Sequence, residues 1–160
     1  MISLVRVDNR LIHGQVIEAW LPHLRVEHLV VADDEACENA LMREAMKMAV
    51  PSTIEVTIRP LAEVDYRALV GDKKKTLLLM RDVSNVVEAR EKGLPVQHVN
   101  LGNVHFSAGR KQVSASVFLS PTELVQLKML AEQGAEVEAR GVPTDRPVPL
   151  PEIEERFGRG

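Results

Sequence analysis

One short segment near the N-terminus gathers residue types that phosphoryl chemistry uses. Arg6, Asp8, Arg10 and His13 lie between an apolar stretch and a helical pattern that begins at Gly14. Histidines titrate around pH ~6.5, so much of an imidazole is neutral, and therefore nucleophilic, near neutral pH. Two guanidiniums can fork onto phosphate oxygens, and the amides at the start of a helix attract an anion. The segment therefore predicts an anion site with a nucleophile, His13, inside it.

The neighbouring residues have expected roles in this loop. Asp8 would hydrogen bond one ring nitrogen of His13 and so fix which nitrogen attacks. Gly14 would let the backbone turn tightly beside the histidine. A structural ion pair between Asp8 and Arg10 is the alternative for those two residues. The loop is neither a Walker loop nor a dinucleotide fingerprint, because Gly14 stands alone and no lysine–threonine pair follows it.

The composition narrows the class of protein. The chain has 160 residues, 45% of them hydrophobic and 27% charged, which favours one globular domain. A net charge of −3 and only 3% aromatics argue against nucleic acid as a partner. Cys37 is the only cysteine and no histidine pair has metal-ligand spacing, so we expect no disulfide, metal or cofactor. No leader or membrane-length apolar run is recognisable, which predicts a cytoplasmic location.

Strand-like apolar runs alternate with amphipathic helical patterns along nearly the whole chain. The expected strands cover residues 2–7, 27–32, 54–58, 76–80, 96–101, 113–119 and 135–140. The expected helices cover residues 14–21, 36–49, 61–70, 83–92 and 121–133. This alternation predicts an α/β fold, a doubly wound, mainly parallel sheet with helices on both faces. We expect one domain over residues 1–150 and a C-terminal tail, 151–160, that closes with one turn around 153–157.

Apolar residues recur at helical spacing along the expected helix 36–49, at Leu41, Ala45, Met48 and Ala49. The residues of this amphipathic helix expected to form core are Met42, Met46, Met48 and Ala49. Asp33 or Asp34 would cap the start of this helix.

In a doubly wound sheet the ligand site lies at the carboxyl ends of the strands, so residues just after strands are further candidates. Asp34, Arg81 and Asp82 follow two expected strands and are candidates for the rim of the site. Helix capping is the alternative for both aspartates. The basic loop 105–111, which carries one exposed-looking ring, is either a docking surface for an acidic partner or a solvated loop.

The run Arg-Val-Asp-Asn-Arg-Leu-Ile-His-Gly-Gln-Val over residues 6–16 resembles a known active-site signature. The signature belongs to the IIB component of the mannose/fructose/sorbose family of the bacterial sugar phosphotransferase system. Its form is R-(I/V)-D-(D/E)-R-L-I-H-G-Q-V followed by a tryptophan, here Trp20. Asn9 departs from the pattern and could alter how Arg10 is held or tune the affinity for the phosphoryl donor. Further matches follow in order at Val30–Glu35, Met46–Pro51, Val99–Asn103, Gly109–Arg110 and Pro143–Asp145.

The resemblance implies a cytoplasmic phosphocarrier with a doubly wound α/β fold. His13 would accept a phosphoryl group, in this family usually on Nδ1, from a phosphohistidine of a IIA component. It would pass the group to a sugar at the membrane components IIC and IID, the activity of a protein-N(π)-phosphohistidine–sugar phosphotransferase. Homodimerisation is compatible with the family. Seven residues match the rest of the catalytic and phosphate-binding loop: Arg6, Asp8, Arg10, Leu11, Ile12, Gly14 and Gln15.

Two other functions stay open at the level of sequence. A regulatory histidine phosphoprotein of the same fold would accept phosphate on His13 but signal to another protein, and neighbouring IIC and IID genes would argue against it. A small-ligand or nucleotide binder would bind tightly without phosphorylation of His13, although the chain lacks a glycine-rich phosphate loop. The sequence does not name the sugar.

Overall fold

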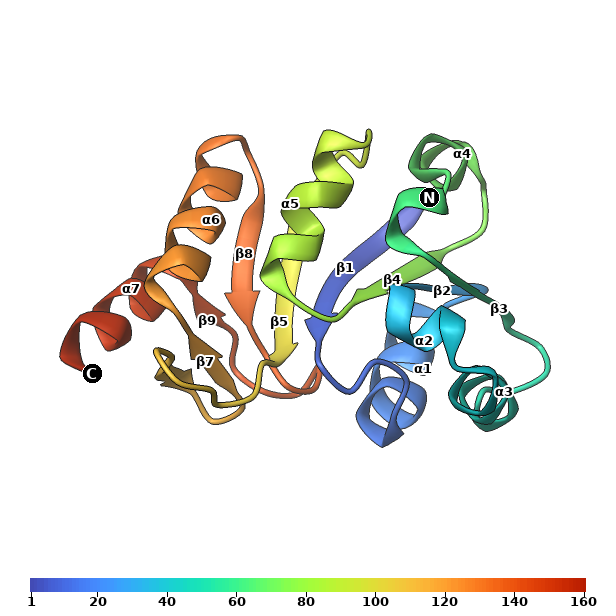
Figure 1. Ribbon diagram of the computed structural model, residues 1–160, viewed down its shortest axis with the longest axis horizontal. Helices are drawn as coiled ribbons and strands as arrows, with labels where there is room; N and C mark the ends of the chain where they lie inside the picture. The colour runs from blue at the N-terminus through green and yellow to red at the C-terminus, as the bar shows by residue number, and fades with distance from the viewer.

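The computed structural model covers residues 1–160 and is built on a seven-stranded sheet in the order β3-β2-β4-β1-β5-β8-β9 (Figure 1). Every neighbouring pair is parallel except β8 and β9. A separate antiparallel hairpin pairs β6 (Lys111–Ser114) with β7 (Val117–Leu119). The strands of the main sheet are β1 (Ile2–Asp8), β2 (His28–Ala32), β3 (Glu55–Arg59), β4 (Thr76–Met80), β5 (His98–Asn103), β8 (Glu136–Ala139) and β9 (Val148–Pro149).

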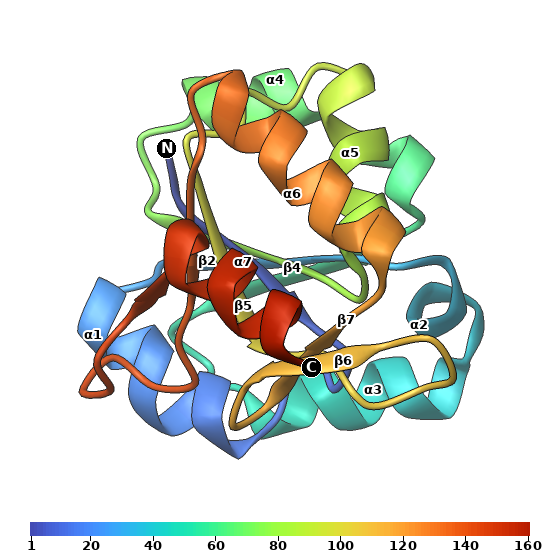
Figure 2. The same ribbon diagram turned by 90° about the vertical axis from the view of Figure 1, so that its left-hand side faces the viewer.

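Helices cover both faces of this sheet, so the predicted doubly wound α/β class is confirmed (Figure 2). One face carries α4 (Tyr66–Gly71), α5 (Val83–Glu91), α6 (Pro121–Glu132) and α7 (Leu150–Arg159). The other face carries the π-helical turn η1 (Val16–Trp20), α1 (Leu21–Leu24), α2 (Asp34–Glu38) and α3 (Ala40–Ala49). A short 3₁₀ turn, η2 (Leu61–Glu63), precedes α4.

The alternation of side chains along β1 decides what reaches the site. Val5 and Val7 point into the larger apolar core, beneath α4–α7. Leu4 joins the smaller core beneath η1 and α1, and Arg6 and Asp8 follow it on that face because side chains alternate along a strand. A central parallel strand is covered on both faces, so these two charged side chains are forced into the interior, at the carboxyl end of the strand.

The long helix expected over residues 36–49 is broken in two. Asp33 caps α2, its Oδ2 accepting from the Ala36 amide at 3.0 Å. Asn39 then ends α2 and caps α3, its Oδ1 accepting from the Met42 amide at 3.0 Å. Asparagine and aspartate side chains satisfy the free amides of a new helix start, which favours a restart over continuation.

The prediction of core residues on this helix is confirmed for two of the four and wrong for the other two. Met46 is buried and Met42 packs partly buried against the smaller core, whereas Met48 is 85% exposed and Ala49 is exposed, as is Leu41 at 83%. The cause is the position of α3 beside β3, the outermost strand of the sheet, where only one side of the helix meets the core. The expected strand 113–119 also differs, because it folds back on itself as the β6–β7 hairpin.

The C-terminal residues form more structure than a tail closed by a single turn. Val148 pairs with Ala139 across β9 and β8, and α7 follows as a ten-residue helix. Ile153 is fully buried in the larger core, together with residues of β8 and α6. The boundary expected at residue 150 therefore coincides with the first residue of a helix that packs on the rest of the chain.

Candidate active site

The segment after β1 makes a turn that presents its side chains toward η1. The Leu11 amide donates to the Asp8 carbonyl at 3.0 Å, and Leu11 has a left-handed backbone with φ of 57°. A left-handed non-glycine residue costs roughly 1–2 kcal/mol, which burial of the Leu11 side chain helps to offset. The helical path starts directly afterwards, with the Ile17 amide donating to the His13 carbonyl at 3.0 Å. The tight turn expected at Gly14 thus occurs at Leu11.

His13 is held by Asp8, as the spacing predicts. Its Nε2 lies 2.7 Å from Asp8 Oδ2, and its side chain is only 8% exposed. An ionised carboxylate can only accept a hydrogen bond, so Nε2 carries the proton and donates it. Nδ1 then bears the lone pair, and it has no hydrogen-bond partner in the structure. Asp8 therefore leaves Nδ1 as the ring nitrogen with a free lone pair, at a position that is buried in this structure, so that a phosphoryl group can reach it only if the loop around it moves.

Asp8 is the centre of a buried hydrogen-bond network. Its Oδ2 accepts from Arg6 Nε at 3.2 Å and from Asn103 Nδ2 at 3.0 Å. Its Oδ1 accepts from the Arg10 amide at 2.9 Å. Burial opposes the charged carboxylate, but the hydrogen bonds from His13 and Asn103 and the charge of Arg6 together hold the pKa of Asp8 below its ordinary value. Asp8 is consequently a fixed anion beneath the imidazole.

Arg6 lies below the site and contributes no surface to it. The side chain is fully buried, and its Nη1 donates to Asn100 Oδ1 at 2.6 Å and to the Arg140 carbonyl at 3.1 Å. The guanidinium passes so close to Gly102 that a Cβ there would lie 2.1 Å from Arg6 Cζ. Of the two guanidiniums expected to fork onto phosphate, this one is therefore committed to Asp8. We call the four buried residues Arg6, Asp8, Asn100 and Asn103 the floor of the site.

Trp20 packs on this floor. Its Nε1 donates to the Gly141 carbonyl at 2.8 Å, and its ring centroid lies 5.2 Å from Arg6 Cζ and 5.5 Å from Arg140 Cζ. Both separations are within cation–π range. The indole thus joins η1 to the segment that follows β8, on the far side of Arg6.

The upper part of the loop is open. Arg10 is exposed and its side chain has no hydrogen bond or ion pair, so it is the guanidinium of this segment that an incoming anion would meet first. Gln15 is drawn in by Asn103, whose Nδ2 donates to Gln15 Oε1 at 3.1 Å. Gly14 is exposed and Ile12 is buried beneath the loop.

Arg81 lies beside the loop and is held by Asp33, not by Asp34. Its Nε and Nη2 donate to Asp33 Oδ1 and Oδ2 at 3.1 and 2.7 Å, and Nη1 approaches the Asn9 carbonyl at 3.5 Å. The hydrogen bond to Asp33 raises the pKa of Arg81. Asp34, expected at the rim or as a cap, instead accepts from the Leu61 amide at 2.8 Å, which anchors η2.

Asn9 joins three loops at the carboxyl edge of the sheet. Its Nδ2 donates to the Arg81 carbonyl at 2.7 Å and to Asp82 Oδ1 at 3.2 Å. Its Oδ1 accepts from the His105 amide at 2.5 Å. A carboxylate could make the last contact but neither of the first two, because it has no donor. The Asn9 side chain makes no hydrogen bond with Arg10; its hydrogen bonds join the turn to the segments after β4 and β5.

The remaining rim candidates are partly structural. Asp82 caps α5 in a capping box with Asn85, which is the alternative expected for it. Arg110 is tied down by a bidentate pair with Glu123, at 2.9 and 3.2 Å, so it does not offer a free cation to an acidic partner. Phe106 is 68% exposed in the same loop. Its ring rests edge-on against Phe118.

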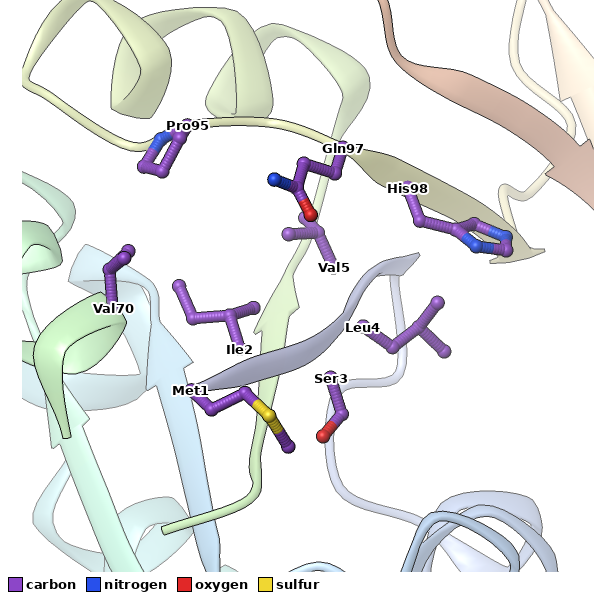
Figure 3. Close-up of a pocket in the computed structure, with 9 residues that line it drawn as sticks. All are labelled: Met1, Ile2, Ser3, Leu4, Val5, Val70, Pro95, Gln97 and His98. Carbon is purple, nitrogen blue, oxygen red and sulfur yellow. The ribbon is translucent and has the colours of Figure 1, made fainter. Parts of the chain in front are cut away.

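A hollow of about 170 Å³ lies at the opposite end of the sheet, at the starts of β1 and β5 (Figure 3). Its walls include Ile2, Val5, Val70 and Pro95, with Gln97 and His98 on one side. Ligand pockets typically enclose about 300–1,000 Å³, so this hollow is small. It contains none of the loop residues. No group of three or more His, Cys, Asp or Glu side chains converges as metal ligands would.

Sequence reasoning found His13, Arg10 and two of the four floor residues, Arg6 and Asp8, but did not assign the other two to the site. Asn100 and Asn103 were recognised only within the motif match Val99–Asn103, which the structure places on β5. Gly102 was visible only as part of the same loop motif. A polar side chain in a strand covered on both faces needs a buried partner, and this is the signal that could have placed them beside Arg6.

The site thus consists of a histidine held by a buried carboxylate at the carboxyl edge of a doubly wound sheet, and comparison with known proteins shows the class of protein that carries it. The family described as "PTS system sorbose subfamily IIB component" matches residues 2–157. The N-acetylgalactosamine-specific phosphotransferase enzyme IIB component 1 of Escherichia coli (strain K12) is 31% identical over 159 residues, covering 94% of this chain and 97% of that protein. The chain therefore belongs to the sorbose subfamily of IIB components of the sugar phosphotransferase system.

Two further comparisons bear on fold and organisation. The crystal structure of the IIBSor domain of the sorbose permease from Klebsiella pneumoniae superposes with a TM-score of 0.86 at 24% identity, covering 97% of each chain. The mannose-specific EIIAB component of Escherichia coli (strain K12) is 28% identical, and the match covers 91% of this chain and 46% of that protein. No helix of the structure is both long enough and apolar enough to span a membrane.

Proposed function

We propose that this IIB component carries phosphoryl groups on Nδ1 of His13. The observation that supports the proposal most strongly is the asymmetry of the ring. Nε2 is bound to Asp8 at 2.7 Å, whereas Nδ1 has no partner. Such a hydrogen bond fixes the tautomer and the orientation of the imidazole, so that the lone pair stands on Nδ1.

The proposed first step conserves the proton on Nε2. The Nδ1 lone pair forms a bond to phosphorus as the donor's nitrogen–phosphorus bond breaks, and that bond's electron pair returns to the donor imidazole. The phosphorylated ring is then cationic unless it loses the Nε2 proton, and the Asp8 carboxylate stabilises that charge at 2.7 Å. The exposed guanidinium of Arg10 is the group proposed to bind phosphoryl oxygens, and catalysis rests on positioning and charge.

The proposed donor is a phosphohistidine of a IIA component, and the proposed acceptor is a sugar hydroxyl presented by IIC and IID at the cytoplasmic side of the membrane. In the second step the bond from Nδ1 to phosphorus breaks, its electron pair returns to the ring, and the hydroxyl oxygen takes the phosphoryl group while a base at the acceptor takes the hydroxyl proton. The match to part of a mannose-specific EIIAB component supports a IIA donor, because that protein's name joins the two parts.

Intact mass after incubation with phosphoenolpyruvate, the general phosphotransferase proteins and a mannose-family IIA tests the carrier step. We expect an acid-labile gain of one phosphoryl group that requires IIA, is absent from His13→Ala and is kept by His23→Ala, an exposed histidine on α1. Nitrogen-edited NMR of the phosphorylated protein should place the group on Nδ1. A gain that survives in His13→Ala, or a group on Nε2, would contradict the proposal.

A second assay separates transport from regulation. Membrane vesicles that contain IIC and IID, with a panel of labelled sugars, should discharge the phosphorylated protein and yield a sugar phosphate. Phosphorylation without discharge to any sugar would favour the regulatory alternative. Tight nucleotide binding without phosphorylation would favour the ligand-binding alternative.

A further inference from the structure

β3 is an edge strand of the main sheet, and only β2 pairs with it. The Glu55 amide donates to the Glu27 carbonyl, and the Arg59 carbonyl accepts from the Asp33 amide, so the odd-numbered residues of β3 direct their backbone groups toward β2. Alternation along the strand then turns the amides and carbonyls of the even-numbered residues outward. No other strand pairs with that side. Unpaired strand edges of this kind are templates for pairing with a further strand.

The two helical layers stop short of this edge. A hollow of about 390 Å³ borders β3 on the side of α3, between Cys37, Lys47 and Arg59. A second hollow, of about 350 Å³, borders it on the side of α4, between Thr57 and Leu69. A strand added to β3 would therefore find space for its side chains on both faces of the extended sheet.

The sequence of β3, Glu-Val-Thr-Ile-Arg, is complementary to itself when read in reverse. With two copies antiparallel about Thr57, Glu55 lies opposite Arg59 of the second copy, and Val56 lies opposite its Ile58. Each kind of side chain thus meets its complement, acid with base and apolar with apolar. From this juxtaposition we infer that β3 is a self-association edge, through which two copies of the chain join into one continuous sheet about a two-fold axis at Thr57.

The backbone independently selects the same register. Val56 and Ile58 are the residues with outward amides and carbonyls, and in this register they form the hydrogen-bonded pairs, each exchanging two hydrogen bonds. Glu55 and Arg59 then occupy non-hydrogen-bonded pairs, in which the Cα atoms lie about 4.5 Å apart and the side chains are closest. A shift of two residues in either direction separates both charged pairs.

The charged partners are available in the single chain. Arg59 is exposed, and its guanidinium has no hydrogen bond or ion pair. Glu55 is half exposed and binds Lys74 Nζ through Oε2 at 2.6 Å, while its Oε1 has only His28 Nε2 beside it, at 3.9 Å, and can accept from a second cation. Self-association would give the Arg59 guanidinium the carboxylate that it lacks within its own chain.

The expected association is weak and reversible. The two-fold axis runs perpendicular to the sheet, so Arg43 and Lys47 beside one hollow face their own counterparts and repel. A five-residue edge also buries less than the roughly 1,200–2,000 Å² of a stable protein interface. The site remains free, because β2 and β4 separate β3 from β1. The inference does not depend on the proposed function.

Sedimentation velocity over a wide concentration range at low salt tests the inference on the full chain. We expect a monomer–dimer equilibrium. Glu55→Arg and Arg59→Glu should each weaken it by about tenfold or more, because each turns two attractive pairs into two repulsive ones. Lys92→Glu, an exposed lysine at the end of α5, should leave it unchanged.

Mixing the two variants makes the test specific for register. Glu55→Arg carries two arginines on its edge and Arg59→Glu carries two glutamates, so the mixture should associate while neither variant does alone. The double variant should recover wild-type association. Near-identical melting curves would show that every variant folds. A wild-type protein that stays monomeric throughout, or variants that dimerise unchanged and gain nothing on mixing, would overturn the inference.

Discussion

Arg6 and Arg10 belong to the same short segment but occupy opposite environments. Arg6 is fully buried, with Asp8, Asn100 and the Arg140 carbonyl as fixed partners. Arg10 is exposed and its side chain touches none of them. The difference arises from backbone geometry, because Arg6 sits in a strand whose alternation points it inward, whereas Arg10 sits in the turn. In the proposed mechanism, Arg6 therefore helps to hold Asp8 beneath His13, whereas Arg10 binds the incoming anion.

Substitutions at a buried and at an exposed charged residue are therefore expected to affect stability differently. Burial lowers the pKa of Arg6 and the Asp8 charge acts in the other direction, so loss of Asp8 would leave the buried guanidinium without its counter-charge. Breaking a buried pair strands a charge in the interior, whereas removing an exposed charge strands nothing. Substitutions in the floor should therefore lower both the free energy of unfolding and the rate of phosphorylation. Substitution of an exposed residue such as Arg10 should lower the rate of phosphorylation alone.

The largest effect is expected from Asp8→Ala. It leaves the Arg6 guanidinium buried without its anion and removes the partner of His13 Nε2. We expect a loss of about 3–5 kcal/mol in the free energy of unfolding, measured by urea denaturation, together with loss of phosphorylation. A loss below about 1 kcal/mol, the level typical of an exposed pair, would show that the buried Asp8 pair contributes no more to stability than a surface pair.

Gly102→Ala should come next, although this glycine does not have a positive φ. An added Cβ would lie 2.1 Å from both Arg6 Cζ and Nη2, and the guanidinium cannot move without leaving Asp8 or Asn100. We expect about 1–3 kcal/mol of destabilisation by the same measurement. Gly71→Ala is the matched control, because nothing lies within 4 Å of its Cβ position. Equal stabilities of the two variants would show that Arg6 is not confined.

Asn9→Asp should have an intermediate effect. The new carboxylate would face the Asp82 carboxylate and the Arg81 carbonyl without a proton to donate. We expect a loss of about 1–3 kcal/mol and slower phosphorylation, since three loops lose a common contact. The double variant Asn9→Asp/Asp82→Asn restores a donor opposite position 9 and should recover part of both. Failure of this rescue would assign the effect to something other than the Asp82 contact.

Lowering the pH should reduce the stability that Asp8 contributes, gradually and by less than the substitutions above. The folded-state pKa of Asp8 lies below its ordinary value of 3.8, so the unfolded chain binds this proton first. The stability that Asp8 contributes is complete above pH 3.8 and is lost as the pH falls from there through the lower folded-state pKa. The urea midpoint of the wild type minus that of Asp8→Asn should shrink over this window. A difference that grows on acidification would contradict the sign.

The smallest effect on folding is expected from Arg10→Ala. Its side chain is exposed and makes no hydrogen bond or ion pair within the chain, so we expect stability within about 0.5 kcal/mol of wild type. Phosphorylation by IIA should nevertheless slow by about 10²–10³-fold, the usual cost of removing one preorganised donor to a developing anion. Rapid-quench measurement of phosphoprotein formation would resolve the rate. An unchanged rate would remove Arg10 from the proposed phosphoryl contact.

Local patterns predicted the parts of the fold that local forces decide. Alternating apolar runs and helical periodicity gave the α/β class, and the capping box at Ser120 and Glu123 placed the start of α6. Longer-range packing decided the rest. Asn39 caps a second helix where periodicity continues through it, and α7 is a full helix because Ile153 completes a core built from distant strands.

In the candidate site, too, contacts between residues near in sequence could be predicted and contacts between distant residues could not. Asp8 and His13 are five residues apart, so their contact could be anticipated from spacing. Asn103 lies 95 residues from Asp8, and the contact exists because β5 is the neighbour of β1. Strand–helix alternation predicts a parallel sheet but not the order of its strands, so the partners of Arg6 could not be assigned from sequence.

The position of Trp20 gives the floor an optical readout. It is the only tryptophan of the chain, and its ring lies beside the guanidiniums of both Arg6 and Arg140. Indole emission from this protein therefore originates at one known place, with no second fluorophore of its kind to dilute it. A change that displaces either charge, from the loop above or from the segment after β8, alters the electric field on that ring. We therefore expect native fluorescence to respond when either guanidinium is displaced, without a label and without any substitution.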